Sequence, residues 1–218
     1  MGERFWRLGG ALVLVCAMIA GVRVAPAAAE GPTQIWAPPG DQYVPRTDGE
    51  TIVWLDGRDG YAGGYKVYGA RMDDGQEFEI SSGSARRSYP DIADNVAIWM
   101  ENNYACDTCS GDIVGKRLAT GETFVIAGTE LDESRSAISG THVVWIERGV
   151  SGDRLLGRDI ETMAEPFIVA NAAEGMRMDL PRFQGDKVIW GESRRTTAGS
   201  DYTLQLTTLF SGEIQTID

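Results

Sequence analysis

The sequence predicts an all-β protein with the β-propeller fold, in which four-stranded sheets called blades pack face to face. The first observation is a six-residue phrase that occurs four times, as TIVWLD, VAIWME, HVVWIE and KVIWGE. The second is its spacing, because the tryptophans are 45, 46 and 45 residues apart: Trp54, Trp99, Trp145 and Trp190. The third is that turn residues and alternating apolar residues recur in step with them, which predicts four short strands in each repeat.

Each strand of the repeat has its own pattern. A first strand is expected around Pro45, Pro90, Ser136 and Pro181, and a turn former follows it at Gly49, Asp94, Gly140 and Gly185. The tryptophan phrase is the second strand. Alternating runs at 65–71, 112–118, 155–160 and 201–207 are the third, and DDGQEFEI, ATGETFVI and FSGEIQTI carry a glycine turn into the fourth. The third repeat has ETMAEPFIV without glycine, which predicts a different turn there.

The recurring tryptophan is expected to fill the gap between neighbouring blades. An acid follows it by two residues and therefore lies on the same side of the strand: Asp56, Glu101, Glu147 and Glu192. We expect these acids to pair with a cation on the adjacent strand, such as Arg71, Arg117 or Arg158. An alternative is that they converge and perform acid–base chemistry, since glycoside hydrolysis needs two carboxylates.

The predicted repeats cover residues 43–84, 85–130, 131–175 and 176–218, preceded by an N-terminal strand and link at 30–42. The stretch PTQIWAPPGDQYVP resembles the end of a fourth strand and its link into the next blade. Four full repeats plus this extra strand fit either a closed four-bladed ring or a partial ring. A partial ring would expose an apolar blade face at each end and favour self-association.

Residues 1–29 have the features of a secretory signal peptide. Arg4 and Arg7 precede an apolar run at 8–22, and the small residues Ala27 and Ala29 follow it. The alternative is a membrane anchor, but a bilayer span needs roughly 20 apolar residues, more than this run offers. We therefore expect an exported protein, periplasmic or extracellular, with no membrane span after cleavage.

The two cysteines after the signal, Cys106 and Cys109, lie in NNYACDTCSGD. A disulfide within this loop suits an oxidising compartment. A redox pair is less favoured because no helix pattern follows the first cysteine, and a zinc site because there is no second pair and His142 is the only histidine. With Tyr104, the loop is a candidate contact surface.

Little else in the chain suggests chemistry. The net charge of −12 disfavours nucleic acid as a partner. There is no Gly-x-Ser-x-Gly motif, and His142 is expected on the outward side of its strand. The glycine-rich loop at 56–64 lacks the aspartate spacing of a calcium loop. We expect no metal and no cofactor.

The segments YPDIADNVAIWMENN and DIVGKRLATGETFVI resemble the repeats of TolB-type and related bacterial cell-surface β-propellers. The resemblance extends over residues 43–218. It implies an exported propeller that binds a protein or glycan partner in the cell envelope, and it carries over no catalytic residue. The alternative function is a secreted carbohydrate-active hydrolase or lyase that uses the repeat carboxylates.

Overall fold

The computed structural model describes residues 40–59, 64–102, 110–197 and 199–217. These residues belong to one compact unit, Trp36–Asp218. The proposed signal at 1–29 and most of the N-terminal strand and link at 30–42 lie outside the described residues. Within the described ranges all regular structure is β-strand, and no helix long and apolar enough to cross a membrane is found.

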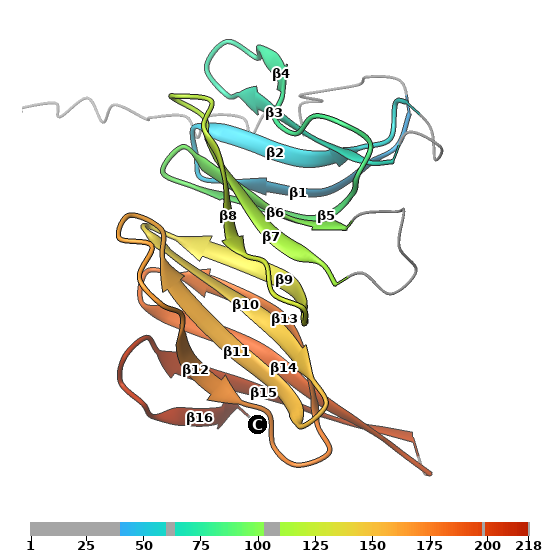
Figure 1. The fold of residues 1–218 in the computed structure, drawn as a ribbon, viewed down its shortest axis with the longest axis vertical. Helices are drawn as coiled ribbons and strands as arrows, with labels where there is room; N and C mark the ends of the chain where they lie inside the picture. Colours follow the sequence, from blue (N-terminus) through green and yellow to red (C-terminus); the bar gives the residue numbers. More distant parts are fainter. Residues whose placement is uncertain (1–39, 60–63, 103–109, 198, 218) are drawn as a thin grey trace, which may run out of the picture. The chain divides into compact units, whose positions relative to one another are not determined.

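Sixteen strands form four antiparallel sheets of four, each following chain order (Figure 1). The first blade is β1 (Gln42–Thr47), β2 (Thr51–Asp56), β3 (Lys66–Arg71) and β4 (Glu77–Glu79). The second is β5 (Arg86–Ala93), β6 (Val96–Asn102), β7 (Asp112–Arg117) and β8 (Thr123–Ala127). The third is β9 (Asp132–Ser139), β10 (His142–Gly149), β11 (Gly152–Asp159) and β12 (Phe167–Asn171). The fourth is β13 (Arg177–Gln184), β14 (Lys187–Thr196), β15 (Gly199–Thr208) and β16 (Ile214–Ile217).

The prediction of four propeller blades is confirmed. Each repeated tryptophan lies in the second strand of its sheet and is buried. Consecutive blades share an apolar core: one side of a blade packs on the tryptophan side of the next. For example, Val53 and Leu55 of the first blade share a cluster with Trp99 of the second. The same arrangement recurs between the second and third blades and between the third and fourth.

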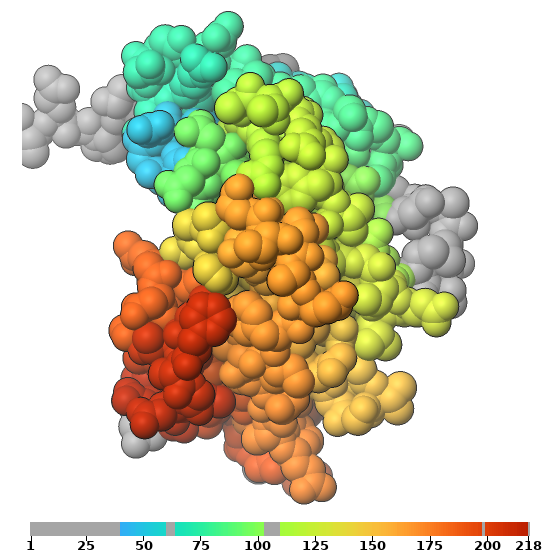
Figure 2. All heavy atoms as spheres, turned by 60° about the vertical axis from the view of Figure 1, so that its left-hand side comes forward, coloured from blue at the N-terminus to red at the C-terminus, as the bar shows by residue number. Residues whose placement is uncertain are grey.

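The blades form a partial ring, one of the two arrangements that the sequence left open. β1, β2 and β3 pack against β5, β5 to β7 against β9, and β9 to β11 against β13. Among the described residues no comparable packing joins a strand of the fourth blade to one of the first. The last strands, β15 and β16, lie at the surface (Figure 2, red). The array therefore ends on an open blade face.

Every first strand carries a β-bulge at the same repeat position. The pairing register shifts there in β1, β5, β9 and β13. The residue at each bulge has a positive φ: Val44 at 53°, Tyr89 at 53°, Arg135 at 55° and Leu180 at 45°. A non-glycine residue in this region costs about 1–2 kcal/mol. Packing of the blade must therefore compensate this cost, and the bulge changes which side the later residues of the same strand face.

The turn in the third repeat is a correction to the sequence prediction. We expected a different turn because glycine is missing. Instead, the amide of Met163 donates to the carbonyl of Asp159, as Gly75 does to Arg71 and Gly121 to Arg117. Met163 has φ 50°, so it occupies the left-handed conformation that glycine holds elsewhere. The third repeat therefore has the same turn as the first two, with methionine in place of glycine.

Candidate functional site

The repeated acids are bound within their own blades. The indole Nε1 of Trp54 donates to Asp56 at 2.9 Å, that of Trp99 to Glu101 at 3.0 Å, and that of Trp190 to Glu192 at 3.1 Å. The expected ion pairs with Arg71, Arg117 or Arg158 are absent from the described contacts of these acids. Residues i and i+2 share one side of a strand, which brings the indole within reach of the acid.

Other cations reach these acids, and in two blades they come from an adjacent strand as expected: Arg87 of β5 lies opposite Glu101, and Arg154 of β11 lies opposite Glu147. Arg58 donates to Asp56 at 2.8 Å, and Arg87 donates to Glu101 at 3.1 Å. Although burial acts to raise it, hydrogen bonds from Arg58 and Trp54 hold the pKa of Asp56 below its ordinary value. These carboxylates hold their own blades together. Among the described residues no contact draws the four acids into a common site, as the acid–base alternative requires.

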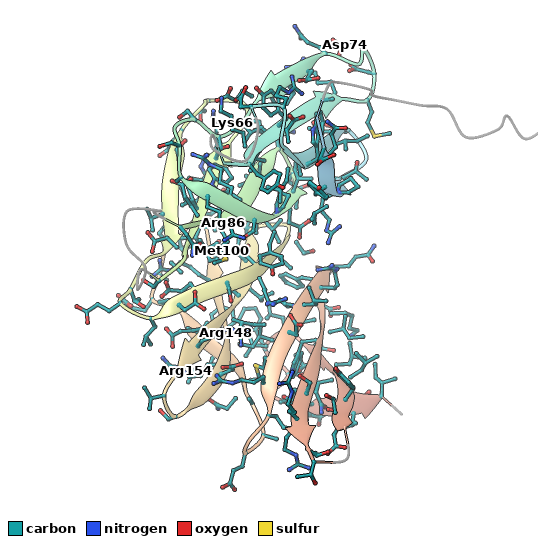
Figure 3. The ribbon with its side chains drawn as sticks, turned by 90° about the vertical axis from the view of Figure 1, so that its right-hand side faces the viewer. Lys66, Asp74, Arg86, Met100, Arg148 and Arg154 are labelled. Carbon is teal, nitrogen blue, oxygen red and sulfur yellow. The ribbon has the colours of Figure 1, made fainter. Side chains whose placement is uncertain are left out.

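The third blade departs from this pattern. Glu147 is bound by Arg154, which Figure 3 labels on that blade, and the Nε1 of Trp145 has no hydrogen-bond partner among the described residues. A buried N–H without a partner costs about 1–3 kcal/mol. Trp145 therefore keeps the packing role of the repeat without its hydrogen bond.

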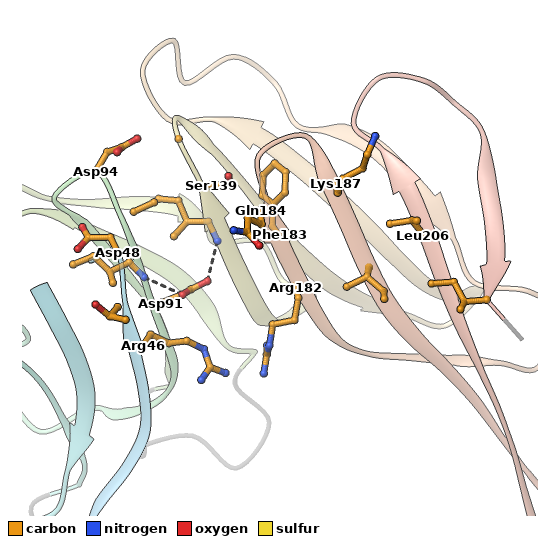
Figure 4. A pocket seen from close by; sticks show the side chains of 17 residues that line it. Arg46, Asp48, Asp91, Asp94, Ser139, Arg182, Phe183, Gln184, Lys187 and Leu206 are labelled. Carbon is orange, nitrogen blue, oxygen red and sulfur yellow. Dashed lines mark hydrogen bonds between the residues drawn. The ribbon is translucent and has the colours of Figure 1, made fainter. Parts of the chain in front are cut away.

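A cavity of about 800 Å³ is lined by residues from all four blades (Figure 4). Arg46 comes from β1, Asp91 from β5, Ile138 from β9 and Arg182 from β13. The side of the fourth blade that faces away from Trp190 also lines the cavity, through Ile189, Leu206 and Ile217. Arg46, Asp91 and Arg182 each stand two residues after a bulge, so the bulges deliver these charged side chains to the cavity.

Two cations of this cavity have no acidic partner within ion-pair distance among the described residues: Arg46 and Arg182. Each donates instead to the carbonyl of its preceding proline, Arg46 to Pro45 at 2.8 Å and Arg182 to Pro181 at 3.0 Å. Burial and then the charge of Arg46 lower the pKa of Arg182. The two guanidinium groups reach from opposite blades to the same side of Asp91 (Figure 4). They form a concentrated positive site.

Asp91 links the second and third blades beside these two arginines. Its carboxylate accepts from the amide of Ile92 at 3.1 Å and from the amide of Ile138, in the third blade, at 3.1 Å. Burial raises its pKa, while the two amides and the charges of Arg46 and Arg182 oppose that rise. Among the described contacts Asp91 forms no ion pair with either arginine, and its charge acts on them only at longer range.

A second group of buried acids lies where the second and third blades meet. Burial raises the pKa of Glu133, and the nearby charges of Asp112 and Glu147 add to that effect. One oxygen of Glu133 accepts from Thr129, and the other has no described partner. Burial, followed by the charge of Glu101, also raises the pKa of Asp112. Both shifts follow first from burial at this blade boundary and then from the like charges nearby.

Other predicted positions have different outcomes. The candidate contact loop with Tyr104 and the proposed Cys106–Cys109 disulfide lies outside the described residues. His142 was expected to face outward, but its ring packs edge-on against Phe167 and Phe210, 6.5 and 5.5 Å between centroids. Its position at the boundary of the third and fourth blades explains the difference. Within the described ranges no group of acids, cysteines and histidines has the arrangement of a metal site.

Sequence reasoning missed Arg46, Asp91 and Arg182. A signal was available, because each follows the repeat proline while the corresponding residue of the third repeat is Ala137. Where the repeats otherwise agree, a position that is charged in some repeats and apolar in another is not needed for the fold and is a candidate for function.

The comparisons with solved structures agree on the fold. TolB from Acinetobacter baumannii superposes with a TM-score of 0.61 at 11% identity, over 86% of this chain and 46% of that one. The chain has a TolB-like β-propeller fold. It also superposes on a puromycin-hydrolyzing peptidase of Mycobacterium tuberculosis with a TM-score of 0.62 at 12% identity, over 84% of this chain and 29% of that one.

A chain of a nidogen–laminin complex matches with a TM-score of 0.60 at 14% identity, over 87% of this chain and 68% of that one. The TolB-like chain thus spans under half the length of the TolB and peptidase chains. No protein-family model and no curated protein matches the sequence. At these identities the likeness concerns the fold alone.

Proposed function

We propose that the chain is an exported, non-catalytic binding module of the cell envelope that recognises a protein partner at the four-blade cavity. The observation that carries this proposal is the pair Arg46 and Arg182, two guanidinium groups at one cavity that lack an acidic partner among the described residues. Cations held together in a partly enclosed site are stabilised when an anionic group enters.

The chemistry of the two arginines favours a partner with carboxylates. A guanidinium binds a carboxylate through two parallel hydrogen bonds, and such charge-assisted bonds are roughly twice as strong as neutral ones. Asp91 stays bound to backbone amides, so an incoming carboxylate does not compete with it for its hydrogen bonds. An acidic stretch of a protein partner meets these requirements. A solved nidogen–laminin complex is consistent with a propeller in the role of a protein-binding module.

The envelope location rests on residues 1–29, whose composition is that of a cleaved signal. TolB structures among the neighbours are consistent with it. Mass spectrometry of the chain recovered from expressing bacteria tests this part. A mature N-terminus at Glu30 supports export, and a cytoplasmic chain that keeps Met1 contradicts it.

Absence of catalysis is the second part of the proposal. The repeat acids are engaged by indoles, arginines and backbone amides of the described structure. A carboxylate committed in this way is poorly placed to act as nucleophile or general acid, which needs direct access to substrate. Turnover of a panel of polysaccharides and peptides by the purified chain, lost in Glu101→Gln, would overturn this part.

The cavity is tested with a defined probe, a fluorescein-labelled hexaglutamate peptide, by fluorescence anisotropy at low salt. We expect Arg46→Gln and Arg182→Gln each to weaken binding about tenfold, since one charge-assisted contact is lost. Arg86→Gln is the matched control, because Arg86 is an exposed cation that does not line the cavity. Equal affinity in the variants and the wild type would refute the site. A labelled uronic-acid oligosaccharide distinguishes a glycan partner from a peptide.

A further inference from the structure

The fourth blade differs from the other three at one pair of positions. In those three, a glycine of the third strand lies opposite a phenylalanine of the fourth strand, on the side away from the tryptophan: Gly69 and Phe78, Gly115 and Phe124, Gly157 and Phe167. A Cβ on these glycines would lie 3.0, 2.8 and 2.6 Å from the ring. The glycine therefore leaves the space that the ring occupies, and the ring lies against the sheet.

In the fourth blade the same two positions hold Leu206 and Gln215. Leu206 lies opposite Ile189, as each glycine lies opposite the residue before its own tryptophan. A leucine side chain thus stands on the fourth blade where its siblings have none, and it lines the four-blade cavity. A position that departs from three otherwise similar repeats, and does so at the cavity, is a candidate for ligand contact.

The cavity wall on the fourth blade passes from a cation to apolar side chains. Arg182 of β13 lies opposite Ile189 of β14, which lies opposite Leu206 of β15. Ile217 of β16 follows on the same side, opposite Leu204. Figure 4 labels Arg182 and Leu206 along this wall. Leu204 is 48% exposed and Ile217 is 41% exposed, so apolar surface is left for a partner.

The charges beside this wall favour an anionic group at one end only. Asp179 is the one acid on this side of the four strands as the structure describes them, and it forms an ion pair with Arg135 of β9. Asp91 reaches the site from the second blade without an ion pair to Arg182. The wall is therefore cationic at Arg182 and apolar beyond it, and a complementary ligand carries an acid followed by apolar groups.

The spacing along the wall matches an extended peptide. Neighbouring strands lie about 4.8 Å apart, so Leu206 is about 10 Å and Ile217 about 14 Å from Arg182 across the sheet. Side chains that face the same way in an extended chain recur about every 6.8 Å. An acid on Arg182 therefore places the second residue after it over Ile189 and Leu206, and the fourth residue beside Ile217.

We propose that the partner of the cavity is an extended segment in which an acidic residue binds the arginine pair and apolar residues two and four positions after it bind Ile189, Leu206 and Ile217. This inference rests on the proposed function and names the sequence pattern that the same cavity selects. A run of acids alone leaves the apolar wall in water and is the weaker ligand.

The test compares two fluorescein-labelled peptides of one composition by anisotropy, Glu-Ala-Leu-Ala-Leu-Ala and Glu-Leu-Ala-Leu-Ala-Ala. In an extended chain the leucines of the first peptide face the same way as its glutamate, and those of the second face the opposite way. We expect the wild type to bind the first peptide about tenfold more tightly, because only its leucines are removed from water. Ile217→Ser and Leu206→Ser should each reduce this preference about threefold, whereas Arg182→Gln should weaken both peptides alike.

Ile214→Ser is the matched control. Ile214 is on the same strand as Ile217 and is 48% exposed, but it lies opposite Thr207, on the other side of the sheet. We expect this variant to keep the wild-type preference.

Equal binding of the two peptides by the wild type would overturn this inference and leave the proposed function standing. So would a preference that neither Ile217→Ser nor Leu206→Ser reduces. Binding of neither peptide would also overturn it, and the hexaglutamate assay then decides whether the proposed function fails as well.

Discussion

Replacing the repeated tryptophan by phenylalanine should destabilise the chain more in the second blade, where the indole donates to an acid, than in the third, where it does not. In Trp99→Phe, the 3.0 Å bond to Glu101 is lost, and a hydrogen bond to a charged group contributes about 1.5–3 kcal/mol. In Trp145→Phe, a buried N–H without a described partner is removed, which relieves about 1–3 kcal/mol. Both indoles are buried, so the loss of ring volume is similar in the two variants.

The lower ends of these ranges predict that Trp99→Phe is less stable than Trp145→Phe by about 2.5 kcal/mol. Urea unfolding followed by circular dichroism measures the difference. With an m value of about 2.5 kcal/mol/M, the two midpoints should differ by about 1 M. Trp190→Phe should follow Trp99→Phe, because Trp190 donates to Glu192 at 3.1 Å. Equal losses in Trp99→Phe and Trp145→Phe would refute the reasoning.

Two further predictions concern buried positions. Burial raises the folded-state pKa of Glu133, so the folded chain binds this proton more tightly than the unfolded chain and stability falls as pH rises through that window. Glu133→Gln should therefore raise the melting temperature at pH 7 by more than at pH 4, and an equal change at both values would contradict this. Gly115→Ala should cost about 1–3 kcal/mol, since its Cβ would lie 2.8 Å from the ring of Phe124. Gly191→Ala, whose Cβ would meet only a carbonyl at 3.7 Å, is the control and should be nearly neutral in thermal denaturation.

The fold was predictable because its signals are local and repeated. A tryptophan phrase that recurs at a nearly constant spacing specifies the second strand of each blade, and the turn formers bound it. The bulges were not predictable from propensity. Tyr89 and Leu180 take left-handed backbone angles that these residue types disfavour, and tertiary packing overrides that preference.

The site was less predictable because it depends on relationships across blades. Arg46 and Arg182 are far apart in sequence, and only the packing of consecutive blades brings them to one cavity. The acids after each tryptophan were found from the sequence, and an adjacent-strand cation was predicted correctly for Glu101 and Glu147, although the three arginines named are not the partners. The indole two residues before the acid was not anticipated, and it donates to the acid in three blades.

The central claim is that the four blades form a partial ring whose last face is open. Thiol labelling tests it most directly, in a chain whose own cysteines are replaced by serine. Leu204→Cys and Leu155→Cys introduce a thiol at the same repeat position, which is 48% exposed in the fourth blade and 0% exposed in the third. In dilute solution we predict that a maleimide reagent modifies Leu204→Cys rapidly and Leu155→Cys only after unfolding. Equal protection of the two thiols would show that the fourth face is covered, and the account would be wrong.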